Sequence, residues 1–278
     1  MEDKILNRVL EHYEEGIKRF SKDCVVSCML HGSQNYHLDF STSDVDTKLI
    51  LVPTFNDIVE NKPPISKIGF MDNEEQINFK DIRLYIEALR KQNINFVETL
   101  FTDWYIINNK FSTQWNRLIA HREEIARLNE YQALRTMIGV MRSEYKHMTK
   151  IIAEEDDGKV YCALDGAIKS IKELGYNPKA YANVCRVYEF LNSYIAGCDY
   201  QECLIPPNID FVRRAKQGAF SKEEVFYHAK SIIESADMYE SNILPRYSGT
   251  EDPKTLALLE DVRYEIMKLA LKGEFENN

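Results

Sequence analysis

The sequence predicts an α+β protein in which a mixed β-sheet with flanking helices, residues 1–110, is followed by an all-helical domain, residues 111–278. Up to about residue 110, short apolar runs separated by turn residues indicate strands. Beyond about residue 112, apolar residues recur with the helical period of 3.6. A chain of 278 residues, 44% of them hydrophobic, has room for one large or two modest domains.

In the first half, apolar spacing predicts an opening amphipathic helix, and four apolar runs predict strands. A turn at Asp72-Asn73 separates the last two strands. The expected elements are a helix at 3–20, a strand at 25–30, a strand that Asp44 and Asp46 open and Pro53 closes, strands at 65–70 and 76–79, and a helix from Ile82. The second half is expected to hold helices at 112–128, 130–154, 159–174, 179–196, 221–243 and 253–272.

The most informative stretch runs from Gly32-Ser33 to Asp46. Side chains alternate along a strand, so Asp44, Asp46 and Lys48 are expected on one side of the sheet. Two adjacent carboxylates repel each other unless a cation lies between them, and a hard cation such as Mg²⁺ takes oxygen ligands from carboxylates and substrate phosphates. The spacing therefore indicates a site for a metal and a triphosphate.

Other residues of this stretch fit the same interpretation. Gly32 allows a ligand to approach the backbone closely, and Ser33 offers a hydroxyl and an N–H to a phosphate. Ser43 directly precedes the carboxylate pair. The simpler alternative is a β-hairpin whose two aspartates are merely solvated at a strand end. The Gly-Ser turn before the pair and the apolar strand after it favour the metal site.

These motifs resemble the signature of the DNA polymerase beta-like nucleotidyltransferase superfamily. More narrowly, they resemble the predicted nucleotidyltransferases of bacteria and phages. The resemblance covers residues 24–108 well and the helical remainder loosely. Two positions depart from the pattern: His37 stands where glycine is expected, and Asn78 stands where some relatives carry an acid. The residues that carry the resemblance are Gly32 to Tyr36, Ser43 to Lys48, Lys80 to Arg83 and Lys91 to Phe96.

The resemblance implies transfer of a nucleoside monophosphate from NTP to an acceptor hydroxyl, with Mg²⁺ or Mn²⁺ held by Asp44 and Asp46. It also implies a third carboxylate that binds metal and assists deprotonation of the acceptor. Asp81 is the candidate, although an aspartate before a helix is also a favoured N-cap. Glu74 and Glu75 are the alternatives.

In the helical half, Lys179 and Arg186 lie seven residues apart on one predicted helix and hence on one face. They resemble the lysine and arginine that helical domains of this superfamily supply to the triphosphate. We therefore expect them to bind nucleotide in a cleft between the two domains. The alternative is an ordinary solvated helix face.

Composition narrows the classes of partner. A net charge of −9 argues against a protein that coats nucleic acid, but it allows a local basic pocket. The six cysteines do not show the spacing of a zinc site. Nothing resembles a signal peptide or a membrane span, so we expect a cytoplasmic protein with no membrane partner.

Two other functions compete with this interpretation. One is a catalytically silent nucleotidyltransferase fold that binds nucleotide or protein, which gains weight if Asp81 is only a helix cap. The other is metal-dependent phosphoester hydrolysis, which needs more His and Asp ligands than the sequence places near Asp46. The acceptor could be an RNA end, a protein or a small molecule, and the sequence does not decide among them.

Overall fold

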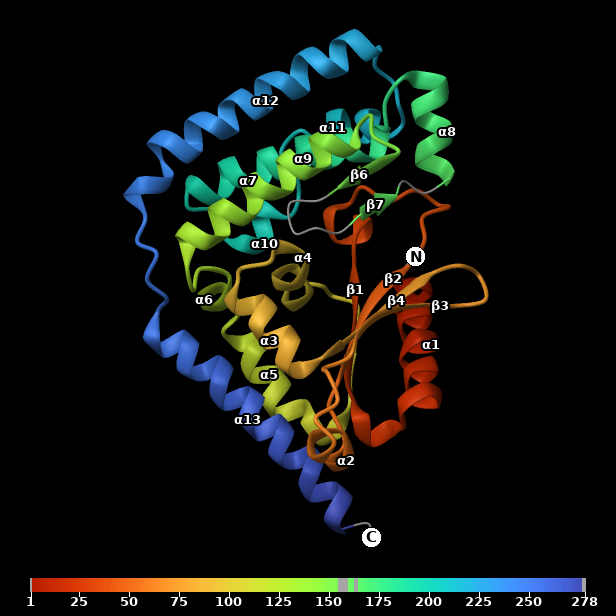
Figure 1. Cartoon of the computed structure of the whole chain (residues 1–278), viewed down its shortest axis with the longest axis vertical. Helices are drawn as coiled ribbons and strands as arrows, with labels where there is room; N and C mark the ends of the chain where they lie inside the picture. The colour runs from red at the N-terminus through yellow and green to blue at the C-terminus, as the bar shows by residue number, and fades with distance from the viewer. Residues whose placement is uncertain (1, 155–159, 163–164, 277–278) are drawn as a thin grey trace. The chain divides into compact units, whose positions relative to one another are not determined.

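The α+β prediction is confirmed: a computed structural model describes residues 2–154, 160–162 and 165–276 and contains a five-stranded mixed sheet and many helices (Figure 1). The strands of the sheet are β1 (Val25–His31), β2 (Asp46–Leu51), β3 (Ser66–Phe70), β4 (Gln76–Asp81) and β5 (Tyr105–Ile107). The helices are α1 (Glu2–Phe20), α2 (Phe55–Val59), α3 (Ile82–Arg90), α4 (Ile94–Val97), α5 (Ser112–Ala120), α6 (Arg122–Ala126), α7 (Glu130–His147), α8 (Asp165–Leu174), α9 (Pro178–Ile195), α10 (Tyr200–Cys203), α11 (Ile209–Lys216), α12 (Lys222–Asn242) and α13 (Pro253–Glu276).

The chain divides into two compact units. A sheet unit comprises residues 1–35, 39–129 and 250–278, and a helical unit comprises residues 36–38 and 130–249. The predicted boundary at residue 110 is therefore wrong. Helix α6 packs on α3, α4 and α5, and α13 returns to pack on α3 and α5. Helical periodicity predicts that a helix buries one face, but it does not say which core that face joins.

The sheet has the strand order β3-β4-β2-β1-β5. β2 runs parallel to β4, and the other neighbours pair antiparallel. One face packs on α1 through a core cluster of Val9, Tyr13, Val25, Cys28, Leu30, Val45, Leu49, Leu51, Ile77 and Phe79. In Figure 1, α1 lies on one side of the sheet, and α3, α5 and α13 lie on the other.

Strand alternation in this unit decides where the polar residues point. Thr47 and Leu49 are buried on the α1 face, so Asp46 and Lys48 project from the opposite face. On β4, Gln76 and Asn78 share that opposite face because Ile77 and Phe79 are buried in the α1 cluster. Asp46 and Lys48 thus share one side of the sheet as predicted, but Asp44, predicted beside them, precedes β2 and is not part of the strand.

The helical unit is built around α9, which contacts α7, α8, α10, α11 and α12. Two predicted helices differ from the structure. The helix expected at 130–154 ends at His147, and residues 152–154 form strand β6 (Ile152–Glu154), paired with β7 (Val160–Cys162). The helix expected at 159–174 begins only at Asp165, while residues 159, 163 and 164 lie outside the described residues.

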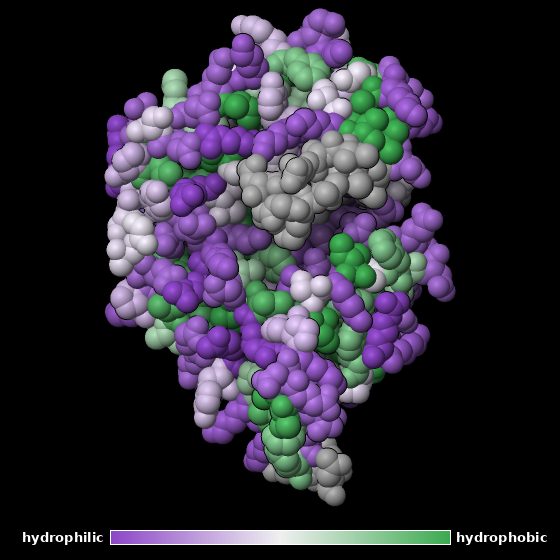
Figure 2. Space-filling model, viewed as in Figure 1, coloured by the Kyte–Doolittle hydropathy of each residue, from purple (hydrophilic) through white to green (hydrophobic). Residues whose placement is uncertain are grey.

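Hydrophilic side chains dominate the face shown in Figure 2, and hydrophobic side chains gather along the C-terminal half of α13. Phe275 near the end of this helix is largely exposed and meets the ring of Phe55 at a centroid distance of 5.0 Å. Among the helices in the described part of the chain, none is both long and apolar enough to cross a membrane.

Candidate functional site

The turn after β1 is open to a ligand. Gly32 has a φ of +109°, which side-chain-bearing residues rarely adopt. A Cβ built at Gly32 would meet no atom within 4 Å. Ser33 follows it in a short 3₁₀ turn, Ser33–Tyr36, whose first bond runs from the Asn35 N–H to the Gly32 carbonyl at 3.1 Å. This turn provides the backbone access that the sequence predicts for a phosphate.

Two buried amides hold the turn: Gln34 ties it to the segment before β2, and Asn35 ties it to β1 and Thr102. The Nε2 of Gln34 donates to the carbonyl of Asp44 at 2.6 Å. The Nδ2 of Asn35 donates to the Leu30 carbonyl at 3.3 Å, and its Oδ1 accepts from the Thr102 hydroxyl at 2.8 Å. The sequence pattern does not predict this role for the two amides. Their only signal is the occurrence of two amides directly after Gly-Ser.

Asp44 and Asp46 lie at the entrance to β2. Asp44 is exposed, while Asp46 is half-buried opposite His31, and its Oδ1 accepts from the Gln76 N–H at 3.0 Å. The Ser43 hydroxyl accepts from the Phe40 N–H at 2.9 Å, so Ser43 closes the turn that presents Asp44.

This donor set fits a hard cation that takes part of its coordination from a substrate. Mg²⁺ is bound by one or two carboxylates and completes its octahedron with water and phosphate oxygens. Within the described residues, no group of three or more His, Cys, Asp and Glu side chains is arranged to hold a metal. A cation at Asp44 and Asp46 would therefore depend on oxygens from outside the protein.

The prediction that Asp81 completes the metal site is wrong. Gln76 lies beside Asp46, but Asp81 pairs with Leu51 at the other end of β2. Five residues of strand put Asp81 about 16 Å along the sheet from Asp46. Asp81 is buried, caps α3 through the Arg83 N–H at 2.8 Å, and accepts two bonds from the Arg83 guanidinium. The helix-cap alternative is confirmed.

Asp81→Asn is therefore expected to keep whatever transfer activity the wild type has, within about two-fold, because Asp81 lies far from Asp46. The free energy of unfolding is expected to fall by about 1–2 kcal/mol, since asparagine caps a helix well but loses the charge that holds Arg83. Activity and urea unfolding of the same preparation measure both effects. A 100-fold loss of activity with unchanged stability would instead show that Asp81 takes part in the reaction.

The alternatives Glu74 and Glu75 do not join Asp46 either. Glu74 is exposed in the β3–β4 turn with a φ of +69°. Glu75 is buried toward α1, where its carboxylate binds Arg8, accepts from the Val45 N–H at 3.1 Å and lies 3.1 Å from the Nε2 of His12. Although burial acts to raise it, bonds with Asn73, Arg8 and Val45 hold the pKa of Glu75 below its ordinary value.

The β4 positions beside Asp46 and Lys48 carry amides, Gln76 and Asn78, in place of acids. Lys48 is buried with its ammonium 4.9 Å from the centre of the Phe96 ring. Burial lowers the pKa of Lys48 to about 8, against the opposing charge of the buried Glu98. Glu98 and Asp46 are thus the acids whose charges act on Lys48, and the place of Glu98 within an apolar run is its signal in the sequence.

His12 makes the stability of the sheet unit depend on pH. Its ring is buried between the Thr47 hydroxyl, at 2.9 Å, and the Glu75 carboxylate. Burial lowers the pKa of His12 below 6.5, against the attraction of Glu75. Since the unfolded chain binds the proton more tightly, stability is expected to fall below pH 6.5, by up to about 1.4 kcal/mol per pH unit.

This pH dependence can be measured by urea unfolding between pH 7.5 and 5.5. Both tryptophans, Trp104 and Trp115, belong to the sheet unit, so their fluorescence reports its unfolding. His12→Gln should flatten the dependence, whereas His228→Gln in the helical unit should leave the tryptophan signal unchanged. An equal slope in wild type and His12→Gln would contradict the assignment.

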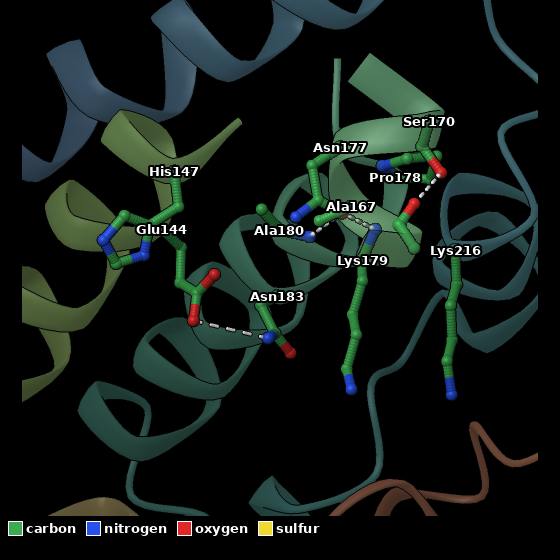
Figure 3. A pocket seen from close by; sticks show the side chains of 11 residues that line it. Glu144, His147, Ala167, Ser170, Asn177, Pro178, Lys179, Ala180, Asn183 and Lys216 are labelled. Atoms are coloured by element: carbon green, nitrogen blue, oxygen red, sulfur yellow. Dashed lines mark hydrogen bonds between the residues drawn. The ribbon is translucent and has the colours of Figure 1, made fainter. Parts of the chain in front are cut away.

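In the helical unit, Lys179 lines a cavity of about 500 Å³ (Figure 3). Lys179 and Lys216 extend in the same direction from this cavity's wall, and the Glu144 carboxylate accepts from the Asn183 amide at 3.5 Å. Burial raises the pKa of Glu144. Lys216 is a cation that was not expected here, because it belongs to α11, a helix that the sequence pattern does not predict.

Arg186 has a different environment from Lys179. It is buried, and its guanidinium stacks on the ring of Tyr36 at 3.9 Å. It is not among the residues that line the cavity. Lys179 therefore lines a cavity, whereas Arg186 contacts another side chain of the protein.

The chain matches no model of a known protein family, and no curated protein is found to be similar to it. The geometry of the turn and the carboxylate pair, together with the resemblance of the motifs between Gly32 and Asp46, is therefore the basis for assigning a function.

Proposed function

We propose that the chain is a metal-dependent nucleotidyltransferase that moves a nucleoside monophosphate from an NTP to an acceptor hydroxyl. The observation that carries the proposal is the carboxylate pair, Asp44 and Asp46, tethered through Gln34 to the open turn at Gly32. In the reaction, the acceptor oxygen attacks the α-phosphorus. The bond between this phosphorus and the oxygen that bridges it to the β-phosphate breaks. Pyrophosphate leaves, and the hydroxyl proton is released.

Each residue has a role that its position supports. Asp44 and Asp46 would hold Mg²⁺ or Mn²⁺, which neutralises charge on the triphosphate and on the reacting oxygens. Gly32 leaves space for phosphate oxygens beside the backbone of Ser33. Lys179 lines a cavity of the helical unit, where its ammonium would be available to a phosphate.

A catalytically silent nucleotide-binding or protein-interaction module is the second candidate. One observation favours it: the β4 positions beside Asp46 and Lys48 are Gln76 and Asn78, whose amides cannot accept the acceptor proton as a carboxylate can. Such a module would bind a metal-nucleotide complex without forming product. Phosphoester hydrolysis has weaker support, because no larger metal-ligand cluster is found in the described residues.

The test uses the full-length protein with each of the four NTPs, labelled at either the α- or the γ-phosphate. Mg²⁺ or Mn²⁺ is added together with RNA, protein extract or a small-molecule extract. Nucleotidyl transfer predicts α-label on one acceptor class and γ-label in pyrophosphate. Release of the γ-label only as inorganic phosphate would indicate hydrolysis. Saturable NTP binding without any product would indicate the silent module.

A further inference from the structure

The segment Tyr36–Leu38, here called the strap, belongs to the helical unit although the residues on both sides of it belong to the sheet unit. The chain leaves the sheet unit after Asn35 and returns at Asp39. The strap therefore interrupts the loop that joins the Gly32 turn to Asp44. Whatever holds the strap also limits the conformations of this loop.

Arg186 holds the first residue of the strap. Its guanidinium lies 3.9 Å from the centre of the Tyr36 ring, and both side chains are only 6% exposed. The Nε of Arg186 has no hydrogen-bond partner among the described residues, so this end of the guanidinium is held by packing. The planar guanidinium of a buried arginine can stack face-on against an aromatic ring. The compact ammonium of a lysine cannot reproduce that stacking.

Two further cations hold the rest of the strap by its backbone. The Nε and Nη2 of Arg213 donate to the carbonyl of His37 at 3.0 and 2.7 Å. The Nζ of Lys216 donates to the carbonyl of Leu38 at 2.8 Å. His37 has a φ of +55°, in the left-handed region that residues other than glycine seldom adopt, and the bonds from Arg213 to its carbonyl help to maintain that conformation.

The loop is held again on either side of the strap. Before it, Asn35 bonds to Leu30 and Thr102 in the sheet unit. After it, Phe40 and Ser43 close a turn through two hydrogen bonds of 2.9 Å, directly before Asp44. Because few residues separate these fixed points, loss of the strap's contacts should loosen the whole segment up to Asp44.

We propose that Arg186 and Arg213 are positioning residues, which hold the strap and thereby the loop that carries Asp44, and that neither binds the nucleotide. The holding itself is independent of the reaction. Its kinetic consequence depends on the nucleotidyltransferase function proposed above.

The first test measures amide hydrogen exchange in residues 33–45 without nucleotide. Arg186→Lys, Tyr36→Leu and Arg213→Ala are each expected to speed exchange at the Ser43 and Val45 amides by about ten-fold, because local opening becomes easier. Tyr36→Phe keeps the ring that stacks on Arg186 and should therefore exchange more slowly than Tyr36→Leu. Arg214→Ala is the matched control, since it removes the neighbouring arginine, which contacts Phe220 instead of the strap.

Exchange that stays at the wild-type rate in Tyr36→Leu and Arg213→Ala would overturn the proposal. Arg213 bonds the strap from an exposed position, so its variant is expected to fold even if Arg186→Lys does not. Faster exchange in a protein that shows no transfer with any acceptor would support the strap and reject the proposed function. The two ideas can therefore fail separately.

The second test is kinetic and applies if transfer is found. A phosphate-binding Arg186 would keep most of its effect as lysine, and its loss would raise the KM for NTP. A positioning Arg186 predicts that Arg186→Lys lowers kcat at least ten-fold with little change in this KM, and that Tyr36→Leu does the same. A rise in KM alone in Arg186→Lys, with wild-type kinetics in Tyr36→Leu, would return Arg186 to the nucleotide site.

Discussion

Replacing Asp44 and Asp46 together with asparagine is expected to lower nucleotidyl transfer by about 10³-fold or more. Removing one or two charges that stabilise a transferring phosphoryl group typically has an effect of this order. The protein should remain folded. Asp44 is exposed, and the amide oxygen of an asparagine at position 46 can still accept the bond from the Gln76 N–H.

The measurement compares single and double variants for transfer, for Mg²⁺-dependent NTP binding and for urea unfolding. If both carboxylates bind one metal-nucleotide complex, the two single losses should not add, because either one disables the site. Asp39→Asn provides a control in the same loop, since Asp39 precedes the turn that presents Asp44. Full activity in the double variant would remove the metal site from the proposal.

The strands around this site could be predicted from the sequence because their signals are local. β1 ends at His31, directly before the Gly-Ser turn, as its apolar run indicates, and β2 begins at Asp46, two residues after the predicted start at Asp44. Alternation along β2 then places Asp46 and Lys48 on one face without any knowledge of the partner strands. The α+β class follows from the same local patterns.

The position of Asp81 could not be predicted because it depends on the register between strands. Asp81 follows an apolar strand in the sequence, and a position near Asp46 is compatible with that order. Only the parallel pairing of Leu51 with Asp81 puts it at the far end of the sheet. Period-2 alternation gives the face of each residue, but it does not give the residue opposite it.

Long-range contacts could not be predicted from local patterns either. Arg186 and Tyr36 are 150 residues apart, and nothing in the sequence around either residue indicates that they stack. Periodicity predicts that α9 buries one face, but an arginine on a helix is ordinarily assigned to solvent or ligand. The return of α13 to the sheet unit is unpredictable for the same reason.

Replacing Glu75 with alanine is expected to lower the free energy of unfolding by about 3 kcal/mol, because it leaves the buried Val45 N–H and His12 without their shared acceptor. Arg8 is partly exposed and can turn to water, so its lost ion pair adds little. Glu75→Gln keeps an acceptor for Val45 and should lose about half as much. Transfer activity should survive in Glu75→Gln, since this carboxylate faces α1 and not Asp46.

The neighbouring Glu74→Ala is the matched control, because Glu74 is exposed and its removal should change stability by less than about 0.5 kcal/mol. Urea unfolding at pH 7.5, followed through the two tryptophans of the sheet unit, measures all three variants under the same conditions. Equal stability of Glu75→Ala and Glu74→Ala would mean that the Glu75 carboxylate does not support the fold. Combined with a large loss of transfer in Glu75→Gln, that result would make Glu75 the missing third acid.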